Sequence, residues 1–315
     1  MDEIARLLRE QSGVLARRQV LEHGGRVADI ERPLRRREWV RLLPGVYVDH
    51  TGEPTWVERA WAGVLFYQPA ALAGMSALRA VAGPGWRRHP DHLPIEIAVD
   101  VDRTVRAVDG YRPRRRAGLD EHVLWNASPP RVRIEEAALD VASRTASELD
   151  IIGLLADVCQ SRRTTALRLI RALDGRERIK RRKWLGAVLR DIADGTHSVL
   201  EHGYLTRVER PHALPRADRQ RSPSSGPKRY RDATYSDFGL DVELDSRLFH
   251  DSADDRDADL DRDLDAAVEQ VDTVRLGWGQ VFGRPCRTAS RIVTLLRQRG
   301  WTGTPRPCGP DCDLA

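Results

Sequence analysis

The sequence predicts a multidomain protein of mixed α+β and α/β class, and three observations lead to that prediction. Its 315 residues exceed the roughly 150 of an average domain, so at least two domains are expected. Hydrophobic residues recur at helical spacing in some segments and at strand spacing in others, along the whole chain. The eight Trp and the 41% of hydrophobic residues supply folded cores, which excludes a wholly disordered protein.

Residues 1–52 are expected to form three short helices followed by a β-hairpin. Apolar residues at helical spacing mark the first helix, and glycines bound a second helix over 17–23. A third helix is expected over 27–39, where Pro33 should either delay its start or kink it. Two β-prone runs around Pro44–Gly45 indicate the hairpin.

Three helices followed by a hairpin is the element order of a winged helix-turn-helix. In that fold the third helix lies in the DNA major groove, and the hairpin contacts the phosphate backbone. The outward positions at the end of the third helix carry four arginines, which we expect to contact DNA: Arg32, Arg35, Arg36 and Arg37. The alternative is a small helical subdomain that packs on its neighbour.

The run REWVRLLPGVYV and the following PTWVERAWAGVLFYQPAALAGMSAL resemble the N-terminal region of AbiEi-type antitoxin-like proteins. That family joins a winged helix-turn-helix to an α/β segment, and the likeness extends to about residue 150. It implies sequence-specific, usually autoregulatory DNA binding in a toxin–antitoxin setting, with a cognate toxin as a candidate partner. It implies no catalytic group.

Residues 53–175 are expected to form an α/β connector. The patterns predict helices over 56–67 and 70–81 and strands over 94–100, 103–108 and 122–125. A long helical stretch is expected over 134–173.

The formal net charge of +5 hides a strong asymmetry along the chain. Residues 176–190 carry seven Lys or Arg and one acid, whereas residues 251–270 carry nine acids and two Arg. Further basic clusters occupy 35–37 and 112–116. Such clusters are often solvated faces, but together they fit a protein that binds the phosphate backbone. We expect the basic helical linker 176–195 to contact nucleic acid through Lys180, Arg181, Arg182 and Lys183.

Residues 196–302 are expected to fold in the order helix, strand, strand, helix, strand, helix. This is the order of a restriction-endonuclease-like core of the PD-(D/E)XK kind. Such a core cleaves phosphodiester bonds by hydrolysis, for which a bound Mg²⁺ activates water and offsets charge at the scissile phosphate.

Three acids in two consecutive strands are the candidate catalytic groups. Asp232 lies in the first strand and Glu243 in the second, so antiparallel pairing can bring them together as ligands of Mg²⁺ or Mn²⁺. Asp245 faces the same side of its strand as Glu243. The alternative is that Asp241, Glu243 and Asp245 form a solvent-facing row on an edge strand.

The same region resembles the domain of unknown function numbered 559, which is related to very-short-patch-repair (Vsr-like) endonucleases. Five ordered blocks over about 100 residues carry the resemblance: SVLE, YRDATY, VELDSRLFH, DLDRDLDAA and VDTVRLGWGQVF. The residues that match the family pattern are Ser198, Glu201, Arg231, Asp232, Glu243, Asp245, His250, Asp259, Arg262, Asp263, Arg275 and Trp278. Ser246 replaces the usual glycine, and Arg231 lies one residue nearer to its aspartate than in the family.

The resemblance implies supporting roles for several of these residues. Glu201 and Asp245 would support the metal or the water, and His250 would donate a proton or orient the substrate. Asp259, Arg262 and Asp263 would brace the site from one side of a helix. Ser198 and Glu201 have a second explanation, because the spacing Ser-x-x-Glu also forms a helix capping box.

These observations predict a DNA-binding protein with a metal-dependent, endonuclease-like domain; the alternative is a non-catalytic, antitoxin-type regulator with a degenerate nuclease fold. Four Cys do not form a disulfide framework, the acidic N-terminus is no secretory signal, and no apolar run could span a membrane. We therefore expect a cytoplasmic protein without a membrane partner. The tail 303–315 is expected to be a flexible extension, because Cys308 and Cys312 alone do not complete a zinc site and Cys286 would need a fourth partner.

Overall fold

The structure is a computed structural model that describes residues 2–84, 86, 88–194, 198–218, 233–244 and 272–314. The expected site residues Asp232, Asp245, His250, Asp259, Arg262 and Asp263 lie outside the described residues. The chain divides into two compact units. The N-terminal unit comprises Met1–Arg144 and Asp157–Arg178, and the C-terminal unit comprises Thr145–Ala156 and Ile179–Ala315. In the part of the chain that the structure describes, none of the helices combines the length and the hydrophobicity that a membrane span requires.

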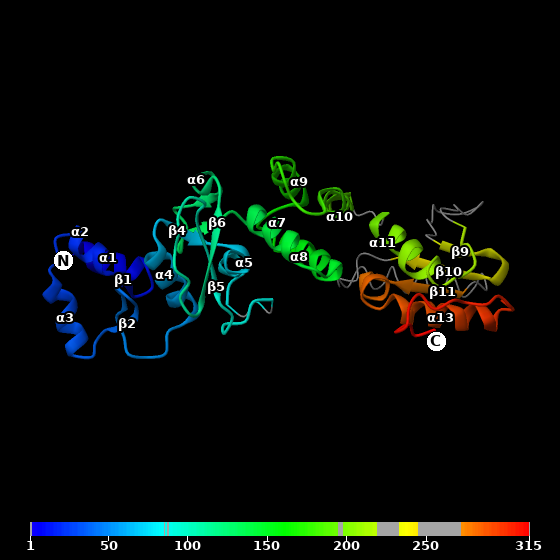
Figure 1. Ribbon diagram of the computed structural model, residues 1–315, viewed down its shortest axis with the longest axis horizontal. Coiled ribbons are helices and arrows are strands. Elements are labelled where there is room, and N and C mark those ends of the chain that lie inside the picture. Colours follow the sequence, from blue (N-terminus) through cyan, green and yellow to red (C-terminus); the bar gives the residue numbers. More distant parts are fainter. Residues whose placement is uncertain are drawn as a thin grey trace. The chain divides into compact units, whose positions relative to one another are not determined.

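The first fifty residues contain the three expected helices and the hairpin, together with a strand that the sequence did not predict (Figure 1). The elements are α1 (Asp2–Glu10), β1 (Val14–Ala16), α2 (Arg17–Glu22), α3 (Val27–Arg35), β2 (Val40–Leu43) and β3 (Val46–Val48). The strands form an antiparallel sheet in the order β1-β3-β2. Helix α3 starts at Val27 and continues through Pro33, so the proline does not delay its start.

The β2–β3 turn depends on its glycine. Gly45 has a φ of 75°, a conformation that costs glycine little, and Pro44 before it supplies the fixed φ of the preceding turn position. The carbonyl of Gly45 accepts a hydrogen bond from the amide of Arg17 at 2.8 Å, which fixes the turn against the start of α2.

The three-stranded sheet is buried on both faces. On one face, Leu15 and Tyr47 pack with Val20 and Ile30, which come from α2 and α3. On the other face, alternate strand residues such as Val46 pack against α4 (Trp56–Tyr67). Because successive side chains of a strand point to opposite faces, both sets of positions in β1 and β3 are apolar. Exposed charged side chains lie on the outer side of α3 and at Arg41 of β2.

The rest of the N-terminal unit is built on a five-stranded sheet in the order β6-β5-β4-β8-β7. Its elements are β4 (Ala70–Leu72), α5 (Gly74–Ala82), β5 (Ile95–Asp100), β6 (Tyr111–Arg116), α6 (Leu119–His122), β7 (Val123–Leu124), β8 (Arg131–Val132), α7 (Ile134–Arg144) and α9 (Ala166–Asp174). The helix expected over 70–81 is wrong in its first turn, because residues 70–72 form a buried central strand.

The strand expected over 103–108 is also wrong. Strands β5 and β6 run parallel, so the chain between them must return along the length of a strand. Residues 103–108 are this return segment. It is tied down by Arg103, whose guanidinium donates to the carbonyl of Tyr67 at 2.7 Å, and by the Tyr67 hydroxyl, which donates to the carbonyl of Arg106 at 2.8 Å. Residues 103–108 have the alternation expected of a strand, but they connect β5 to β6 and pair with no strand that the structure describes.

The helical stretch expected over 134–173 is three helices. They are α7, α8 (Glu148–Gln160) and α9, and α9 packs on α7 within the N-terminal unit. The non-helical segment between α8 and α9 ends at Thr165. The Thr165 hydroxyl accepts a hydrogen bond from the amide of Arg168 at 3.3 Å and so caps the N-terminus of α9.

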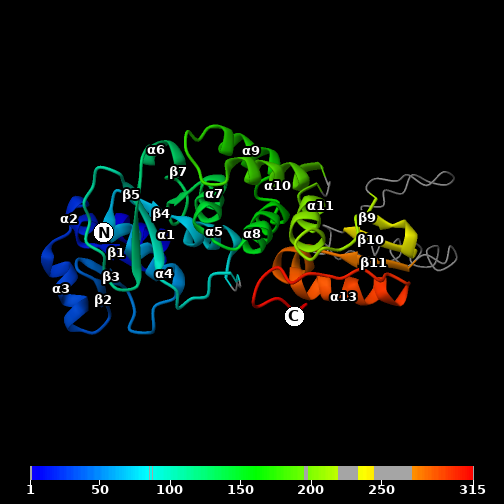
Figure 2. The ribbon, with the colours of Figure 1, turned by 45° about the vertical axis from the view of Figure 1, so that its right-hand side comes forward.

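The C-terminal unit combines helices with a mixed three-stranded sheet in the order β11-β10-β9 (Figure 2). Beside the first part of α8, its elements are α10 (Arg182–Asp194), α11 (Ser198–Gly203), the π-helix η1 (Tyr204–Glu209), β9 (Ala233–Tyr235), the 3-10 helix η2 (Ser236–Phe238), β10 (Leu240–Leu244), β11 (Asp272–Leu276), the π-helix η4 (Gly279–Gly283) and α13 (Pro285–Gln298). Strand β10 is antiparallel to β9 and parallel to β11.

Helix α13 packs on η1 and η4, and the buried Tyr204 hydroxyl lies 2.9 Å from the hydroxyl of Tyr235 on β9. The chain after α13 folds back onto this core. The amide of Arg306 donates to the carbonyl of His212 at 3.0 Å, and Cys312 is buried. These two tail residues therefore contact the rest of the unit, and the expected flexibility of 303–315 stays a prediction.

Candidate functional site

The four arginines expected to contact DNA are exposed. Arg32 and Arg35 lie on α3, and Arg36 and Arg37 follow its last residue, whereas Ile30 and Leu34 pack inward on the same helix. We call this exposed side, with the two residues that follow it, the arginine face of α3. Arg36 forms a loose ion pair with Glu38 at 3.8 Å, and both side chains are exposed. Arg41 extends the positive surface onto β2.

The second basic cluster is only partly available to a ligand. Arg181 donates from its guanidinium to the carbonyls of Thr145 and Ala146 at 2.9 and 3.2 Å, and so ties the start of α10 to the start of α8. Lys180 and Lys183 are exposed, and Arg182 is half-buried. Arg181 therefore has a structural role, and the two lysines remain the accessible cations of this cluster.

Two of the four arginines of β6, Arg114 and Arg116, form ion pairs inside the N-terminal unit, whereas Arg112 and Arg115 are exposed. Arg116 lies 2.5 Å from carboxylate oxygens of both Glu136 and Asp140, and Arg176 pairs with the same two acids. Burial raises the pKa of Glu136, but the charges and hydrogen bonds of Arg176 and Arg116 outweigh burial, so the pKa lies below its ordinary value. Arg114 in turn pairs with the buried Glu96 at 2.9 Å.

Glu243, an expected metal ligand, lies on β10 with its carboxylate half-buried. Strand β10 is hydrogen-bonded to a strand on each side, and Asp241 is only 3% exposed. The alternative of a solvent-facing acidic row on an edge strand is therefore wrong for Asp241 and Glu243. Oε2 of Glu243 accepts a hydrogen bond from Nε of Arg275 on β11 at 3.1 Å.

Helix α11 carries the other described candidate, Glu201, which is half-buried. The helix begins at Ser198, and the amide of Val199 donates to Oδ2 of Asp191 on α10 at 2.7 Å. The carboxylate of Asp191 thus caps this helix start from a neighbouring helix. The structure does not describe the Ser198 side chain, so the capping box remains a prediction.

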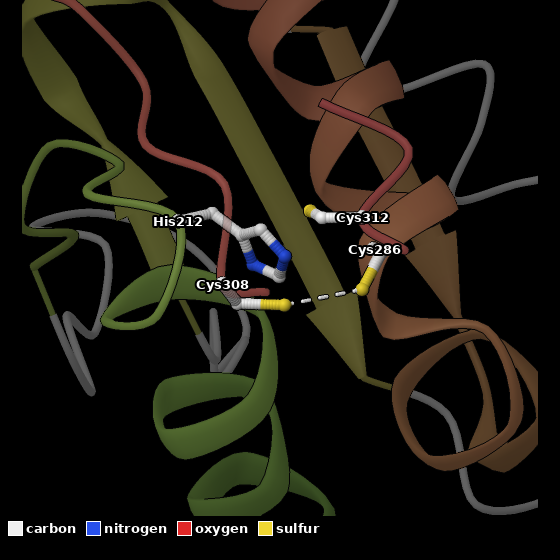
Figure 3. A group of neighbouring side chains, drawn as sticks. All are labelled: His212, Cys286, Cys308 and Cys312. Carbon is white, nitrogen blue, oxygen red and sulfur yellow. Dashed lines mark hydrogen bonds between the residues drawn. The ribbon is translucent and has the colours of Figure 1, made fainter. Parts of the chain in front are cut away.

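A second site comes from residues that lie far apart in the sequence. His212, Cys286, Cys308 and Cys312 each place one donor atom within 4.8 Å of the others, and we call them the thiol–imidazole cluster (Figure 3). The sulfur atoms of Cys286 and Cys308 are 3.4 Å apart. The imidazole and the Cys312 thiol are buried. The sequence offered no fourth partner for Cys286, and the structure places His212 in that position.

Nδ1 of His212 donates a hydrogen bond to the carbonyl of Val208, four residues earlier, at 2.8 Å. This bond fixes the ring orientation and leaves Nε2 with a lone pair. Nε2 is buried and has no hydrogen-bond partner among the described residues. An acceptor of this kind is costly to bury unless something binds it.

Comparisons with known proteins show no family. A scan against protein-family models finds no match, and a search of curated proteins finds none either. One solved structure, the crystal structure of RV2827C protein from Mycobacterium tuberculosis, is similar at 21% identity and a TM-score of 0.37. The alignment covers 62% of this chain and 81% of that one. At this TM-score the likeness supports no conclusion about the present protein.

Proposed function

We propose that this protein binds DNA through its N-terminal module and hydrolyses phosphodiester bonds with its C-terminal unit. The main support for DNA binding is that α3 has an apolar inward side and a basic outward side. Its inward residues belong to a buried core, its outward side presents Arg32 and Arg35, and two more exposed arginines follow directly after its last residue. Such a face suits the closely spaced phosphates of duplex DNA.

The arrangement around α3 supports the winged helix interpretation. The order α1, β1, α2, α3, β2, β3 with a β1-β3-β2 sheet is what a winged helix-turn-helix requires. In that arrangement α3 enters the major groove, and the β2–β3 hairpin lies beside it against the backbone. Arg41 on β2 extends the positive surface in the way that such a hairpin contact needs.

The mixed sheet of the C-terminal unit supports the hydrolytic half. An antiparallel pair followed by a parallel strand, with α11 before and α13 after, agrees with a PD-(D/E)XK core. Val242 pairs with Ala233, the residue that follows Asp232 in the sequence. Glu243 and Asp232 would hold Mg²⁺ or Mn²⁺, whose preference for carboxylate oxygen fits them. The ion would supply an activated water and charge compensation at the phosphate.

The remaining expected residues have supporting parts in this proposal. Glu201 and Asp245 would orient the water, and His250 would give a proton to the leaving oxygen. Arg262 would offset negative charge that develops on the phosphate, between the bracing carboxylates Asp259 and Asp263.

A specific observation favours a second function, that of a non-catalytic, antitoxin-type transcriptional regulator. The carboxylate of Glu243 is already paired with Arg275. A guanidinium in that position competes with a cation for the same oxygens. In a degenerate nuclease core, this ion pair would stabilise the sheet in place of a metal.

Plasmid nicking separates the two functions. We expect the purified full-length protein to nick supercoiled plasmid with Mg²⁺ or Mn²⁺ and not with EDTA, and Asp232→Ala to abolish nicking. The matched control is Asp237→Ala, which removes an exposed carboxylate from η2 of the same unit and should nick normally. Binding of a promoter fragment without cleavage under any divalent metal would leave only the regulator.

A further inference from the structure

We propose that the thiol–imidazole cluster binds one Zn²⁺ ion as a closed structural site, separate from the proposed nuclease centre. Three thiolates and one imidazole are a ligand set of structural zinc sites, which are tetrahedral and take all four ligands from the protein. The soft sulfur donors distinguish this site from the carboxylate site, which suits Mg²⁺. Zinc–sulfur bonds of about 2.3 Å in a tetrahedron place sulfur atoms about 3.8 Å apart. All four donor atoms here lie within 4.8 Å of one another, so only small shifts are needed.

The orientation of His212 points to a ligand independently of the cysteines. A zinc-binding histidine donates its other ring N–H to a carbonyl or carboxylate, which fixes the tautomer and raises the basicity of the binding nitrogen. Nδ1 of His212 makes this bond to the Val208 carbonyl, which leaves the buried Nε2 as the nitrogen available to the cluster. A histidine with a purely packing role would not require its second nitrogen to face three thiols.

The local backbone brings the cysteines together. Cys286 is the second residue of α13, so its position is fixed by the start of that helix. The amide of Cys312 donates to the carbonyl of Gly309 at 3.3 Å, which turns the chain so that Cys308 and Cys312 approach the same point. Three separate segments therefore meet at the cluster: the turn after η1, the start of α13 and the tail (Figure 3).

A disulfide between Cys286 and Cys308 explains less of the geometry. Their sulfur atoms are 3.4 Å apart, well beyond a sulfur–sulfur bond of about 2.05 Å. Such a bond would account for two of the four donors. It would not explain why the buried Cys312 thiol and Nε2 of His212 lie at the same point, whereas a zinc ion would bind all four donor atoms.

The ion would fix the tail and α13 to the segment that follows η1. Because α11 and η1 form one continuous stretch, the site would also fix the position of the helix that carries Glu201. We expect no open coordination position and hence no direct part in catalysis.

The test is metal analysis of the untagged full-length protein, purified under reducing conditions without chelator. We expect about one zinc per chain by plasma mass spectrometry. Cys308→Ser and His212→Ala should reduce the zinc content to background. The matched control is Cys159→Ser, the same substitution at a half-buried cysteine in α8 outside the cluster, which should keep its zinc.

Co²⁺ substitution in the wild-type chain gives a readout that does not depend on folded variants. We expect the visible absorption of tetrahedral cobalt and the near-ultraviolet band of cobalt–thiolate bonds. Wild-type protein with neither zinc nor these bands would overturn the proposal. So would intact-mass analysis of the reduced-purified protein showing a Cys286–Cys308 disulfide. Zinc content does not depend on nicking, so loss of the proposed nuclease activity would leave this result unaffected.

Discussion

Nε of Arg275 on β11 donates to Oε2 of Glu243 on β10 at 3.1 Å, between directly paired positions of two parallel strands. Both side chains are about three-quarters buried, with 21% and 27% exposed. A metal ion at Glu243 would therefore have to compete with the guanidinium of Arg275 for the carboxylate oxygens. Whether Glu243 binds a metal or only Arg275 is what separates the nuclease from the regulator.

If Glu243 is a metal ligand, Glu243→Gln should slow Mg²⁺-dependent nicking on the order of 100-fold, since losing about 2.7 kcal/mol of transition-state stabilisation corresponds to that factor. The amide keeps the size of the side chain and can still accept a hydrogen bond from Arg275. Single-turnover nicking rates measure the effect, with Asp237→Asn in η2 as the control. A Glu243→Gln protein that nicks at the wild-type rate would contradict the assignment.

The arginine face of α3 predicts a salt-dependent affinity for DNA. Replacing Arg32 and Arg35 by Ala should weaken binding to specific and random duplexes by similar factors. It should also reduce the slope of log affinity against log salt by about one for each phosphate that the variant no longer binds. Fluorescence anisotropy at several salt concentrations measures both quantities. Arg168→Ala, at an exposed arginine of α9, is the charge-matched control. An unchanged slope in the double variant would show that DNA does not contact this face.

The buried Glu136 should make the N-terminal unit sensitive to acid. Its pKa lies below the ordinary 4.5 because Arg176 and Arg116 outweigh the effect of burial. A folded-state pKa below the unfolded value stabilises the protein above pH 4.5, and that stabilisation is lost as the pH falls through the folded pKa. Glu136→Ala should cost about 3 kcal/mol near neutral pH, because it leaves the guanidinium groups of Arg116 and Arg176 to share one carboxylate, that of Asp140, where the wild type has two. Chemical unfolding between about pH 7 and pH 3 measures this, with the exposed Glu53→Gln as the control. A Glu136→Ala protein whose stability falls with pH as in the wild type would contradict this origin of the acid sensitivity.

Close packing at Gly203 predicts a steric effect in the C-terminal unit. A Cβ at this position would lie 2.5 Å from Cζ of Phe282 and 3.1 Å from Cγ1 of Val281. Gly203→Ala should therefore destabilise the unit by about 1–3 kcal/mol, the usual cost of overpacking. Gly279→Ala is the control, because its Cβ would meet nothing nearer than 3.7 Å. Thermal unfolding of the two variants compares them, and equal melting temperatures would contradict the packing argument.

Sequence patterns predicted long, strongly periodic elements well and short buried ones poorly. Helix α4 over 56–67 and strand β5 follow the prediction closely. Strands β1 and β4 are three residues each, which is too short to show a period of two. Strand β6 consists mostly of arginines; acids in α7 and β5 neutralise its two partly buried ones, Arg116 and Arg114, and the other two are exposed. That compensation depends on tertiary contacts, which no local pattern records.

The two candidate sites differ in how far the sequence could reveal them. Glu243 was found because an ordered set of motifs surrounded it. The thiol–imidazole cluster was missed because strands β9 to β11 separate His212 from Cys286, and His212 stands in no ligand-spaced motif. The available signal was three cysteines within the last thirty residues, but three unassigned histidines of the same expected domain, His197, His202 and His212, were equally possible fourth ligands.

The parallel pairing of β10 with β11 also bears on how fast each part of the chain folds. The hairpin β2–β3 joins strands that are two residues apart in sequence, whereas β10 and β11 are separated by residues 245–271. Bringing distant segments together costs more chain entropy before any contact repays it. We therefore expect pulsed hydrogen exchange during refolding to show protected amides in β2–β3 before β10–β11. Simultaneous protection would contradict this order. In a cell, a nascent C-terminal unit would thus expose unpaired strand edges for longer, and would be the part that most needs protection from aggregation.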